Sequence, residues 1–455
     1  MFQGDEISKF IESPEKLATE VLKRIFKDKE PSFPIDPFKI LDELNVVYQF
    51  RGFKDLEGIY IVPEDEDDIH IIGINNERPI TRQRFTAAHE LCHYLKDSKE
   101  SNICPIDGRK KSPIEKFADK FASALLMPTK YLDNEVKKYE VDGYISFDDV
   151  LLVSEYFGVS FESCVFNIAY KLKKISGNTD YKILKKRISN YKPNNKKIEL
   201  GIISSEKPLL INIINSYKLF FENESNFIWY KFKNDFIYNE NKMEGVNIES
   251  EDVAELITDL RVKSQKSEYC NSQYKDIIEV LGHSSVYDYI LSTDTKISAF
   301  SILSLHNKLY QYAPYPEEGG KFRNSNNYVT QSKFETADYK EIMSLILELD
   351  EMVKNLLEEK DNLSISEYID KAVEIHHKIT VIHPFNDGNG RVSRAFLNWL
   401  FRLKNIPPVY LKYDKKAEYY DALKSADIEK DYDKLSVIFY KQIIYSMIQL
   451  NRKVI

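Results

Sequence analysis

Cysteine and tryptophan are scarce in this sequence, and neither sign of charge dominates it. The 455 residues include 4 cysteines with no CxxC spacing, which excludes a disulfide scaffold and a cysteine-only zinc knuckle. The chain has 64 Lys and Arg against 72 Asp and Glu, and its net charge of -8 gives no strong nucleic-acid signal. Signal-peptide character is lacking, and so is an apolar run of about 18 residues, so we expect a cytoplasmic protein without a membrane partner.

Apolar and aromatic residues, in contrast, are abundant enough for large cores. Hydrophobic residues make up 43% of the sequence and aromatic residues 13%, and the length favours several domains over one compact unit. Basic residues dominate the stretch 171–197, where Asp180 is the only acidic residue. We interpret this stretch as a solvated tether, with a phosphate-binding patch as the open alternative. The predicted division is one domain over 1–175, a basic linker over 176–199 and a second domain over 200–455.

The two parts differ in their patterns of apolar residues. In the first part, a helix followed by a strand is expected within 35–50, and β-branched runs at 56–62 and 69–75 flank an acidic turn, which predicts a hairpin. Helical periodicity over 82–96 predicts a buried helix. The second part is almost wholly helical in period, with one long turn-rich interruption at 311–332.

The buried helix of the first part contains the string His89-Glu90-Leu91-Cys92-His93, which fits HExxH. Residues four apart lie on one face of a helix, so both imidazoles can reach one zinc ion, and Glu90 is placed to act as a general base. About 0.01 matches to this pattern are expected by chance in a chain of this composition. The alternative is a buried helix whose histidines only satisfy hydrogen bonds, and uncompensated polar groups would make that costly.

Zinc in a catalytic site takes a third protein ligand and keeps a fourth position open. Glu115, on the next expected helix, is the best candidate, and Asp119 one turn later can accept the second ring N–H of a ligating histidine. A capping role for Glu115 is the alternative, because Ser112 and Glu115 have the spacing of a capping box. Three acidic residues in the intervening turn are rival ligands: Asp97, Glu100 and Asp107.

The strings FTAAHELCHYL (85–95) and EKFADKFASALLMP (115–128) resemble the ImmA/IrrE family of zinc metallopeptidases, whose usual form is FTxAHELGH followed by ExxANxFA and LLMP. The resemblance implies an α+β gluzincin-like metallopeptidase domain. It also implies the site residues, with zinc ligands at His89, His93 and Glu115 and the general base at Glu90.

This sequence departs from the family form at two positions. Cys92 stands where glycine is usual and places a thiol beside the metal helix, and Asp119 stands where asparagine is usual. The resemblance implies limited proteolysis of a protein substrate, such as a repressor or an antitoxin. An extended substrate would then lie beside the strand 69–75 by β-augmentation.

The densest functional string is HPFNDGNGRVSR (383–394), in the second part. Gly388 and Gly390 bracket Asn389, which lets the backbone form an anion nest at the start of a helix. The string also supplies forked guanidinium donors for phosphate oxygens and a hard oxygen ligand for a metal ion. An imidazole at its start can serve as general base. The residues with these functions are Arg391 and Arg394 for phosphate, Asp387 for Mg²⁺, and His383 for the proton.

The same string resembles the HPFx(D/E)GNGRxxR signature of Fic domains. The resemblance implies an all-α domain with a small β-hairpin flap, here at GGKFRNSNNYV (319–329), and transfer of AMP from ATP to a Ser, Thr or Tyr hydroxyl of a target protein. It assigns the proton to His383 and Mg²⁺ to Asp387. The phosphates would be held by Gly388, Asn389, Gly390, Arg391 and Arg394.

The N-terminal part of this domain contains a candidate inhibitory helix at 236–253. It resembles the (S/T)xxxE(G/N) motif of Fic proteins that carry their block on the N-terminal side, since Glu244 and Gly245 match. Glu240 stands at the Ser/Thr position, so that half of the motif is missing. A Glu244–Arg394 pair would occupy the γ-phosphate site, whereas the alternative is a surface glutamate at a helix end.

Taken together, the sequence predicts a Fic AMP-transferase fused to a zinc endopeptidase, in a stress, toxin–antitoxin or mobile-element regulatory role. The alternative function keeps the transferase and treats the first part as a non-proteolytic partner-binding or sensing module. The remaining histidines of the second part are expected to be structural, because nothing nearby in the sequence completes a ligand set. These residues are His283, His306, His376 and His377.

Overall fold

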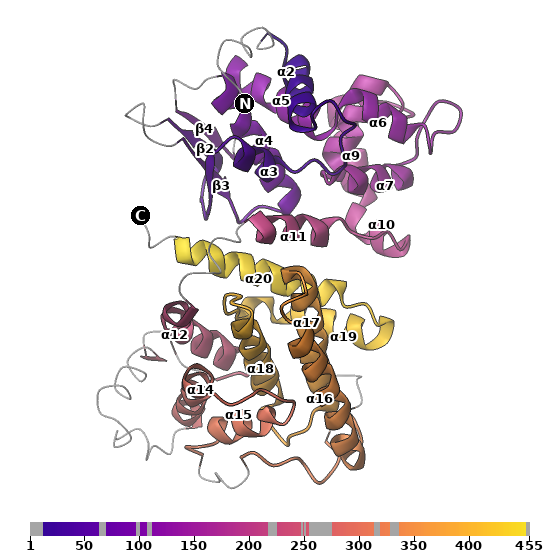
Figure 1. The fold of residues 1–455 in the computed structure, drawn as a ribbon. Helices are drawn as coiled ribbons and strands as arrows, with labels where there is room; N and C mark the ends of the chain where they lie inside the picture. Colours follow the sequence, from indigo (N-terminus) through magenta and orange to yellow (C-terminus); the bar gives the residue numbers. More distant parts are fainter. Residues whose placement is uncertain are drawn as a thin grey trace. The chain divides into compact units, whose positions relative to one another are not determined.

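Two compact units make up the chain, Met1–Ser216 and Tyr217–Ile455 (Figure 1). The structure, a computed structural model, describes residues 12–62, 70–96, 101–106, 112–216, 225–246, 249, 252–253, 275–313, 319–327 and 336–451. None of the helices formed by these residues combines the length and the apolar character needed to cross a bilayer.

A four-stranded sheet in the first unit has the strand order β1-β3-β2-β4. The strands are β1 (Val47–Arg51), β2 (Leu56–Ile61), β3 (Ile71–Asn75) and β4 (Asn102–Pro105). β3 pairs in parallel with β1 and antiparallel with β2, and β4 pairs antiparallel with the other edge of β2. Among the described strands, β1 and β4 are therefore the edges of the sheet.

This pairing confirms one expectation and corrects another. The runs 56–62 and 69–75 do supply an antiparallel pair, through β2 and β3. The prediction that an extended substrate lies beside 69–75 is wrong, because both edges of β3 are already paired with strands. A β-branched run predicts a strand but does not tell a central strand from an edge strand.

Helices cover this sheet and form the rest of the first unit. The central helix is α4 (Ile80–Lys96), which packs against β2, β3 and the helix α5 (Pro113–Leu126) (Figure 1). The other helices up to residue 172 are α2 (Pro14–Ile25), α3 (Pro37–Glu43), α6 (Thr129–Val136), α7 (Phe147–Phe157), α8 (Phe161–Asn167) and the short η1 (Ile168–Leu172). Side chains that accept a first-turn amide cap five of these starts, namely Ser13, Asp36, Ser112, Ser146 and Ser160.

The segment predicted as a linker is folded and belongs to the first unit. It forms α9 (Tyr181–Tyr191) and α10 (Pro193–Glu199), and α11 (Glu206–Ser216) follows and packs against α3 and α4. Tyr191 stacks on Phe161 at 5.1 Å between ring centroids, and its hydroxyl donates to Asp148 Oδ1 at 2.6 Å. The predicted boundaries of 176–199 and 200 therefore differ from the structure, because a basic, turn-rich composition does not reveal that aromatic side chains anchor the segment.

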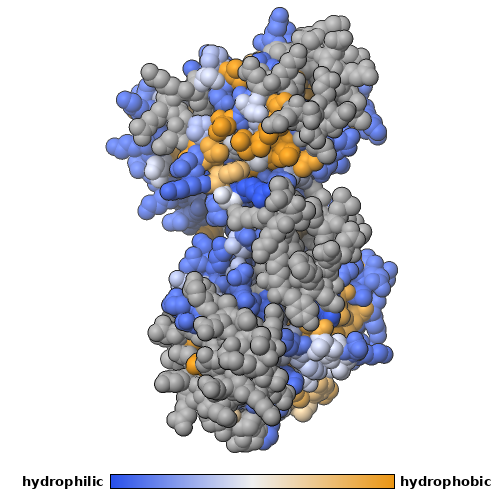
Figure 2. Space-filling model, turned by 90° about the vertical axis from the view of Figure 1, so that its left-hand side faces the viewer, coloured by the Kyte–Doolittle hydropathy of each residue, from blue (hydrophilic) through white to orange (hydrophobic). Residues whose placement is uncertain are grey.

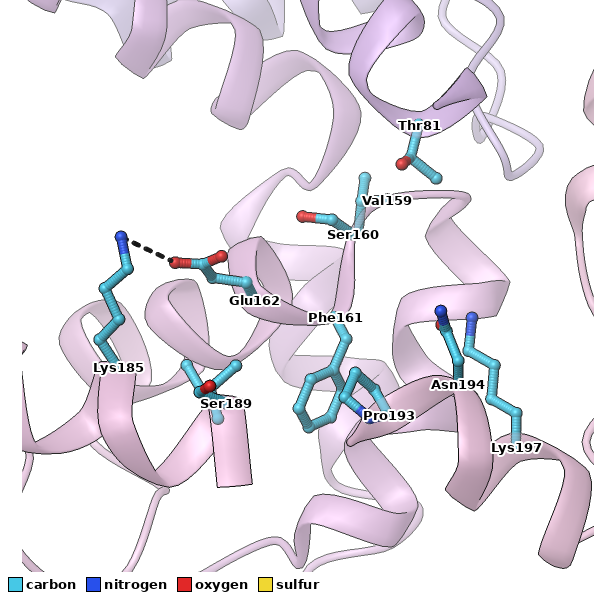
Figure 3. A pocket seen from close by; sticks show the side chains of 11 residues that line it. Thr81, Val159, Ser160, Phe161, Glu162, Lys185, Ser189, Pro193, Asn194 and Lys197 are labelled. Carbon is cyan, nitrogen blue, oxygen red and sulfur yellow. Dashed lines mark ion pairs between the residues drawn. The ribbon is translucent and has the colours of Figure 1, made fainter. Parts of the chain in front are cut away.

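Two lysines of this segment pair with acidic residues of α7 and α8. Lys197 forms an ion pair with Glu155, and Lys185 lies 3.9 Å from Glu162. A pocket of about 470 Å³ lies beside them and is also lined by Ser160 (Figure 3). Since these ammonium groups have carboxylate partners, neither a free tether nor a phosphate patch follows from the charge run alone.

The described residues of the second unit form helices joined by irregular segments, and none of them forms a strand. Its elements are α12 (Ser225–Met243), α14 (Lys275–Ser292), α15 (Ser301–Leu309), η6 (Tyr339–Glu341), α16 (Ile342–Glu359), α17 (Ile365–Ile382), α18 (Asn389–Leu403), η7 (Tyr413–Lys415), α19 (Lys416–Glu429) and α20 (Asp433–Asn451). α18 packs against α14, α15 and α17, and its residues from Asn389 to Phe401 are buried except Gly390. This burial holds the start of α18, and the loop before it, in a fixed place.

The expected flap falls partly on described residues. Residues 319–327 are turn and irregular backbone, and the rest of 319–329 lies outside the described residues. Arg323 anchors the described part, because its main-chain N–H donates to Pro384 O at 2.9 Å and its Nε to His383 O at 2.8 Å. The segment thus lies against the start of the string 383–394, and its hairpin form remains a prediction.

Candidate functional site

The two histidines of HExxH and the glutamate of α5 converge in the first unit. His89 and His93 are buried on α4, and their Nε2 atoms are 3.2 Å apart. Glu115 Oε2 lies 3.2 Å from His89 Nε2, and Glu115 Oε1 lies 3.3 Å from His93 Nε2. Tetrahedral zinc with bonds of about 2.0–2.1 Å holds its ligand atoms about 3.3 Å apart, so these three side chains have the spacing of a zinc site.

Asp119 and Ser112 support this cluster from α5. His89 Nδ1 lies 3.1 Å from Asp119 Oδ1, which leaves Nε2 as the atom that faces the cluster. Ser112 Oγ accepts from Glu115 N at 3.2 Å, so α5 is capped while the Glu115 carboxylate is directed at the histidines. Burial lowers the pKa of His89, but hydrogen bonds to Asp119, Cys104 and Glu115 outweigh burial and raise this pKa well above its usual value.

Glu90 is fully buried next to the cluster, and neither of its carboxylate oxygens has a hydrogen-bond partner. Burial raises its pKa to about 7, although the two histidines act in the opposite direction. The sheet approaches closely here, because a Cβ on Gly58 of β2 would lie 2.6 Å from Glu90 Oε1. A buried carboxylate without a partner is costly, so the site fits a ligand that would face Glu90.

A cysteine that the sequence analysis did not select also reaches this cluster. The ligand atoms of His89, Cys104 and Glu115 all lie within 4.8 Å of one another. Cys104 is buried on β4, whereas Cys92, the thiol noted from the family pattern, is buried on α4 and is not in that group of described residues. The only signal in the sequence was a cysteine between the two ligand-bearing helices. The rival ligands Asp97, Glu100 and Asp107 lie outside the described residues.

In the second unit, the string 383–394 is a tight loop between two helices. His383 ends α17 with φ 50° and Gly388 begins α18 with φ 76°, so the loop has a left-handed residue at each end. Asn389 fixes the loop from inside, because its side chain accepts from Phe385 N at 2.9 Å and donates to Phe385 O at 2.8 Å. The Asn389 side chain is thus engaged in holding the loop.

Asp387 extends from this loop with a largely exposed side chain. Tyr310 donates its hydroxyl to Asp387 Oδ2 at 2.9 Å, and the carboxylate is a hard oxygen ligand suited to Mg²⁺. His306 Nε2 lies 3.1 Å from Asp387 O, and the ring stacks on Phe385 with centroids 3.9 Å apart. His306 Nδ1 accepts from Gly320 N at 2.9 Å, so this histidine joins the loop to the segment 319–327.

The other histidines divide into paired and unpaired groups. His376 lies 2.8 Å from the Tyr419 hydroxyl, and His377 lies 2.7 Å from Asp427 Oδ1, which agrees with a structural function. His283 is fully buried, and neither ring nitrogen has a hydrogen-bond partner.

Burial lowers the pKa of His383 below its usual value, so its imidazole is neutral at pH 7.

The two arginines of the string are held by carboxylates. Arg391 Nη1 lies 2.8 Å from Glu279 Oε2. Arg394 Nη2 lies 2.7 Å from Glu244 Oε1, and Arg394 Nε contacts Glu240 Oε2 of α12. The Ser/Thr position that the sequence analysis regarded as missing is therefore occupied by a second carboxylate on the same guanidinium.

Gly390 explains how Glu244 fits at the start of α18. A Cβ at residue 390 would lie 2.9 Å from Glu244 Oε1 and 3.0 Å from Arg394 Nη1. Burial raises the pKa of Glu244, but Arg394 and Arg391 outweigh burial and hold it below its usual value. For Glu240, burial prevails over Arg394 and the pKa is raised. A negative charge therefore already stands where the positive helix terminus favours an anion.

Comparison with known proteins gives matches for both units. Residues 51–168 match the model of the IrrE N-terminal-like domain, and residues 296–401 match that of the Fic/DOC family. Protein adenylyltransferase fic-1 of Caenorhabditis elegans is 32% identical over 133 residues, which is 29% of this chain and 25% of that protein. Protein adenylyltransferase Fic of Drosophila erecta is 31% identical over 152 residues, 33% of this chain and 29% of that protein.

The chain spans only about a quarter of the length of these curated relatives. A solved structure of Fic-1 from C. elegans is 19% identical, covers 67% of this chain and 88% of that chain, and has a TM-score of 0.43. The resemblance that the sequence motifs indicated is confirmed, because one family model matches within each unit, the IrrE N-terminal-like domain at 51–168 and the Fic/DOC family at 296–401.

Proposed function

We propose that the second unit transfers AMP from ATP to a Ser, Thr or Tyr hydroxyl of a target protein. The observation that carries this proposal is the place of the Glu244 carboxylate, which is paired with Arg394 at the start of α18 and admitted by Gly390. A site that holds a carboxylate in this way offers the same donors to a phosphate oxygen. Matching relatives named protein adenylyltransferase support the same reaction.

In this reaction the residues of the loop have separate functions. The target hydroxyl oxygen bonds to the α-phosphorus of ATP, pyrophosphate leaves, and neutral His383 takes the hydroxyl proton. Arg391 and Arg394 bind phosphate oxygens once Glu279 and Glu244 have released them. The main-chain amides of Asn389 and Gly390 would face the same phosphates, and that of Gly388 would join them once it leaves Asp387 Oδ1, to which it donates at 2.7 Å. Asp387 would hold Mg²⁺, which when bound offsets phosphate charge, and the segment 319–329 would hold the target beside the loop.

We further propose that the first unit is a zinc-dependent endopeptidase that acts on a protein substrate such as a repressor or antitoxin, in a stress, toxin–antitoxin or mobile-element role. His89, His93 and Glu115 would hold zinc, which when bound supplies a Lewis acid for amide hydrolysis. Glu90 is poised as general base, since its pKa of about 7 matches a neutral working pH. An extended substrate would pair with β4, the described edge strand that carries Cys104 beside the cluster.

One observation favours a second function for this unit, a non-proteolytic partner-binding or sensing module. Cys104 lies within reach of the candidate metal position, and a site with four protein ligands is typical of structural zinc. The two functions are separated by incubating the zinc-loaded protein with an unfolded substrate such as casein. Endopeptidase activity predicts cleavage that Glu90→Ala abolishes, whereas a binding module predicts no cleavage by either protein.

We call the pairing of Glu240 and Glu244 with Arg394 the clamp. The transfer reaction is tested with labelled ATP in a lysate, and the Glu244→Gly variant is the background so that the intact clamp does not mask activity. His383→Ala should lower target labelling by about 10²–10⁴-fold. Lys378→Ala is a matched control on the same helix, where its ammonium pairs with Glu348 at 3.1 Å, and it should leave labelling unchanged. Labelling that persists in the His383 variant would exclude the proposed reaction.

A further inference from the structure

We propose that Cys104 is a fourth protein ligand of the metal site in the first unit. The ion would then be enclosed by His89, His93, Glu115 and the Cys104 thiolate, with no position left open. This inference rests on the proposed metal site. It adds a residue that lies outside HExxH and outside the pair Glu115 and Asp119 on α5. It also assigns the bound state a chemistry, mixed nitrogen, oxygen and sulfur ligation, that suits zinc.

The strand register directs Cys104 toward the metal helix. Cys104 of β4 lies opposite Gly58 of β2, and side chains that lie opposite each other point to the same face of a sheet. A Cβ on Gly58 would meet Thr86 Cγ2 at 2.4 Å and Glu90 Oε1 at 2.6 Å, so that face is the one packed on α4. The exposed neighbour Ile103, at 56%, faces the other way, whereas Cys104 is only 4% exposed.

The distances bring the thiol within reach of a shared ion. The ligand atoms of His89, Cys104 and Glu115 lie within 4.8 Å of one another. His93 is not in that group of described residues, but its Nε2 lies 3.3 Å from Glu115 Oε1, so it would share the ion from the other side of the glutamate. Tetrahedral zinc, with bonds of about 2.3 Å to sulfur and 2.0–2.1 Å to nitrogen, would hold sulfur and nitrogen about 3.5 Å apart. The Cys104 thiol would therefore have to move closer to the histidine nitrogen by about 1 Å. Its side chain lies on a short edge strand, where such a movement is small.

A second, independent feature points to a ligand missing from this cluster. Glu90 is 0% exposed, and both of its carboxylate oxygens lack a hydrogen-bond partner. Buried polar groups are rarely left in this state, so a group that faces Glu90 belongs in the site. A bound cation would supply the opposite charge that the buried Glu90 carboxylate lacks.

Ligation by Cys104 would decide which chemistry the site can perform. As the sulfur–metal bond forms, the thiol S–H bond breaks, the proton goes to solvent, and the fourth position is filled. Structural zinc sites are closed in this way, whereas catalytic sites keep that position open. Departure of Cys104 would open the position next to Glu90, so the thiol acts as a removable block on the proposed endopeptidase.

Cobalt substitution tests this inference through a spectroscopic signal that does not depend on activity. The whole protein is loaded with Co²⁺, and bound metal per chain is measured together with the near-ultraviolet absorption. We expect one ion per chain and a thiolate-to-cobalt charge-transfer band that Cys104→Ser removes. Cys92→Ser is the matched control, since this thiol is equally buried on α4 but outside the cluster, and its variant should keep the band.

The possible outcomes separate this inference from the proposed metal site. One bound ion without a charge-transfer band in the wild type, or a band that survives Cys104→Ser, would overturn Cys104 ligation and leave the three-ligand site intact. No bound ion in the wild type would overturn both. Zinc affinity, measured by competition with a chromophoric chelator, gives a second readout, and Cys104→Ser should weaken it by at least about tenfold. Circular dichroism confirms that each variant is folded.

Discussion

The two units use glutamate for opposite purposes. In the first unit, Glu115 lies 3.2 and 3.3 Å from two imidazoles and completes a set of donors for a cation. In the second unit, Glu244 and Glu240 occupy the guanidinium of Arg394 at a helix N-terminus, which is an anion position. A carboxylate is thus a ligand in one unit and a substitute for the ligand in the other.

The difference follows from what surrounds each carboxylate. Imidazole nitrogens and a carboxylate are the donors that a zinc ion binds, so a metal ion that displaces the ring protons would stabilise them together. Arg394 and the start of α18 offer N–H donors, and Glu244 already satisfies them. We therefore expect the first cluster to gain its function by binding an ion, and the second to gain its function by losing a contact.

The largest expected effect comes from removing both carboxylates of the second unit. Glu240→Ser combined with Glu244→Gly should raise AMP transfer by about 100-fold, because a closed state worth about 3 kcal/mol is lost. Glu244→Gly alone should raise it by only about tenfold, since Glu240 still holds Arg394. The initial rate of transfer from labelled ATP to the same target measures both variants.

The free energy of unfolding gives an independent check on this prediction. The double variant leaves Arg394 buried without a carboxylate partner, so its free energy of unfolding should fall by about 3–5 kcal/mol in the absence of ATP. Glu249→Gly is the matched control, because Glu249 pairs with Lys242 at 3.3 Å and its side chain is 68% exposed. Equal rates for the single and double variants would show that Glu240 does not take part in the clamp.

A smaller effect is expected when the support of the metal cluster is removed. Asp119→Ala should weaken zinc binding by about 10–100-fold, because His89 loses the carboxylate that fixes its ring. Glu115→Ala should go further and abolish stoichiometric zinc, since a ligand itself is lost. Competition with a chelator measures both affinities. Unchanged zinc binding in the Glu115 variant would show that this carboxylate is not a ligand, and the contrast between the two units would fail.

Sequence patterns predicted these sites where the residues are close in the chain. HExxH and the string 383–394 place their residues by helix geometry and by glycine turns, and α4, α5, α17 and α18 occur where periodicity predicts them. The fold of the basic segment 176–199 could not be predicted, because its helices depend on aromatic packing such as Tyr191 on Phe161. Charge and turn residues carry no information about such partners.

Local sequence patterns also could not predict which residues reach a site through the register of the sheet or through a distant helix. Cys104 reaches the metal cluster because β4 pairs with β2 opposite Gly58, and no motif encodes that register. Glu240 was regarded as a departure from a motif, yet its helix brings it to Arg394. A substitution within a motif can thus keep the contact while the residue type changes, and only the three-dimensional structure reveals it.

The smallest expected effect is the pH dependence of AMP transfer, which separates the imidazole of the second unit from its carboxylates. Burial lowers the pKa of His383 below 6.5, with Arg323 acting in the same direction and the Thr380 carbonyl, Asp387 and Glu244 opposing it. A lowered pKa keeps the imidazole mainly neutral as the pH falls from 8 to 7, so kcat/KM should stay nearly constant over that range. Below the pKa the base becomes protonated, and kcat/KM should fall by about tenfold per pH unit.

This pH dependence is best measured in a variant without the clamp carboxylates, because the fall of kcat/KM at low pH can then be assigned to one group. In the Glu240→Ser, Glu244→Gly variant the clamp carboxylates are absent, so they cannot titrate in the same range. Burial lowers the pKa of His306 to about 4, which keeps that ring neutral over most of the limb. A midpoint above pH 6.5 in this variant would mean that His383 is not the base whose environment the structure describes, whereas a midpoint below it would tie the proton transfer to this buried imidazole.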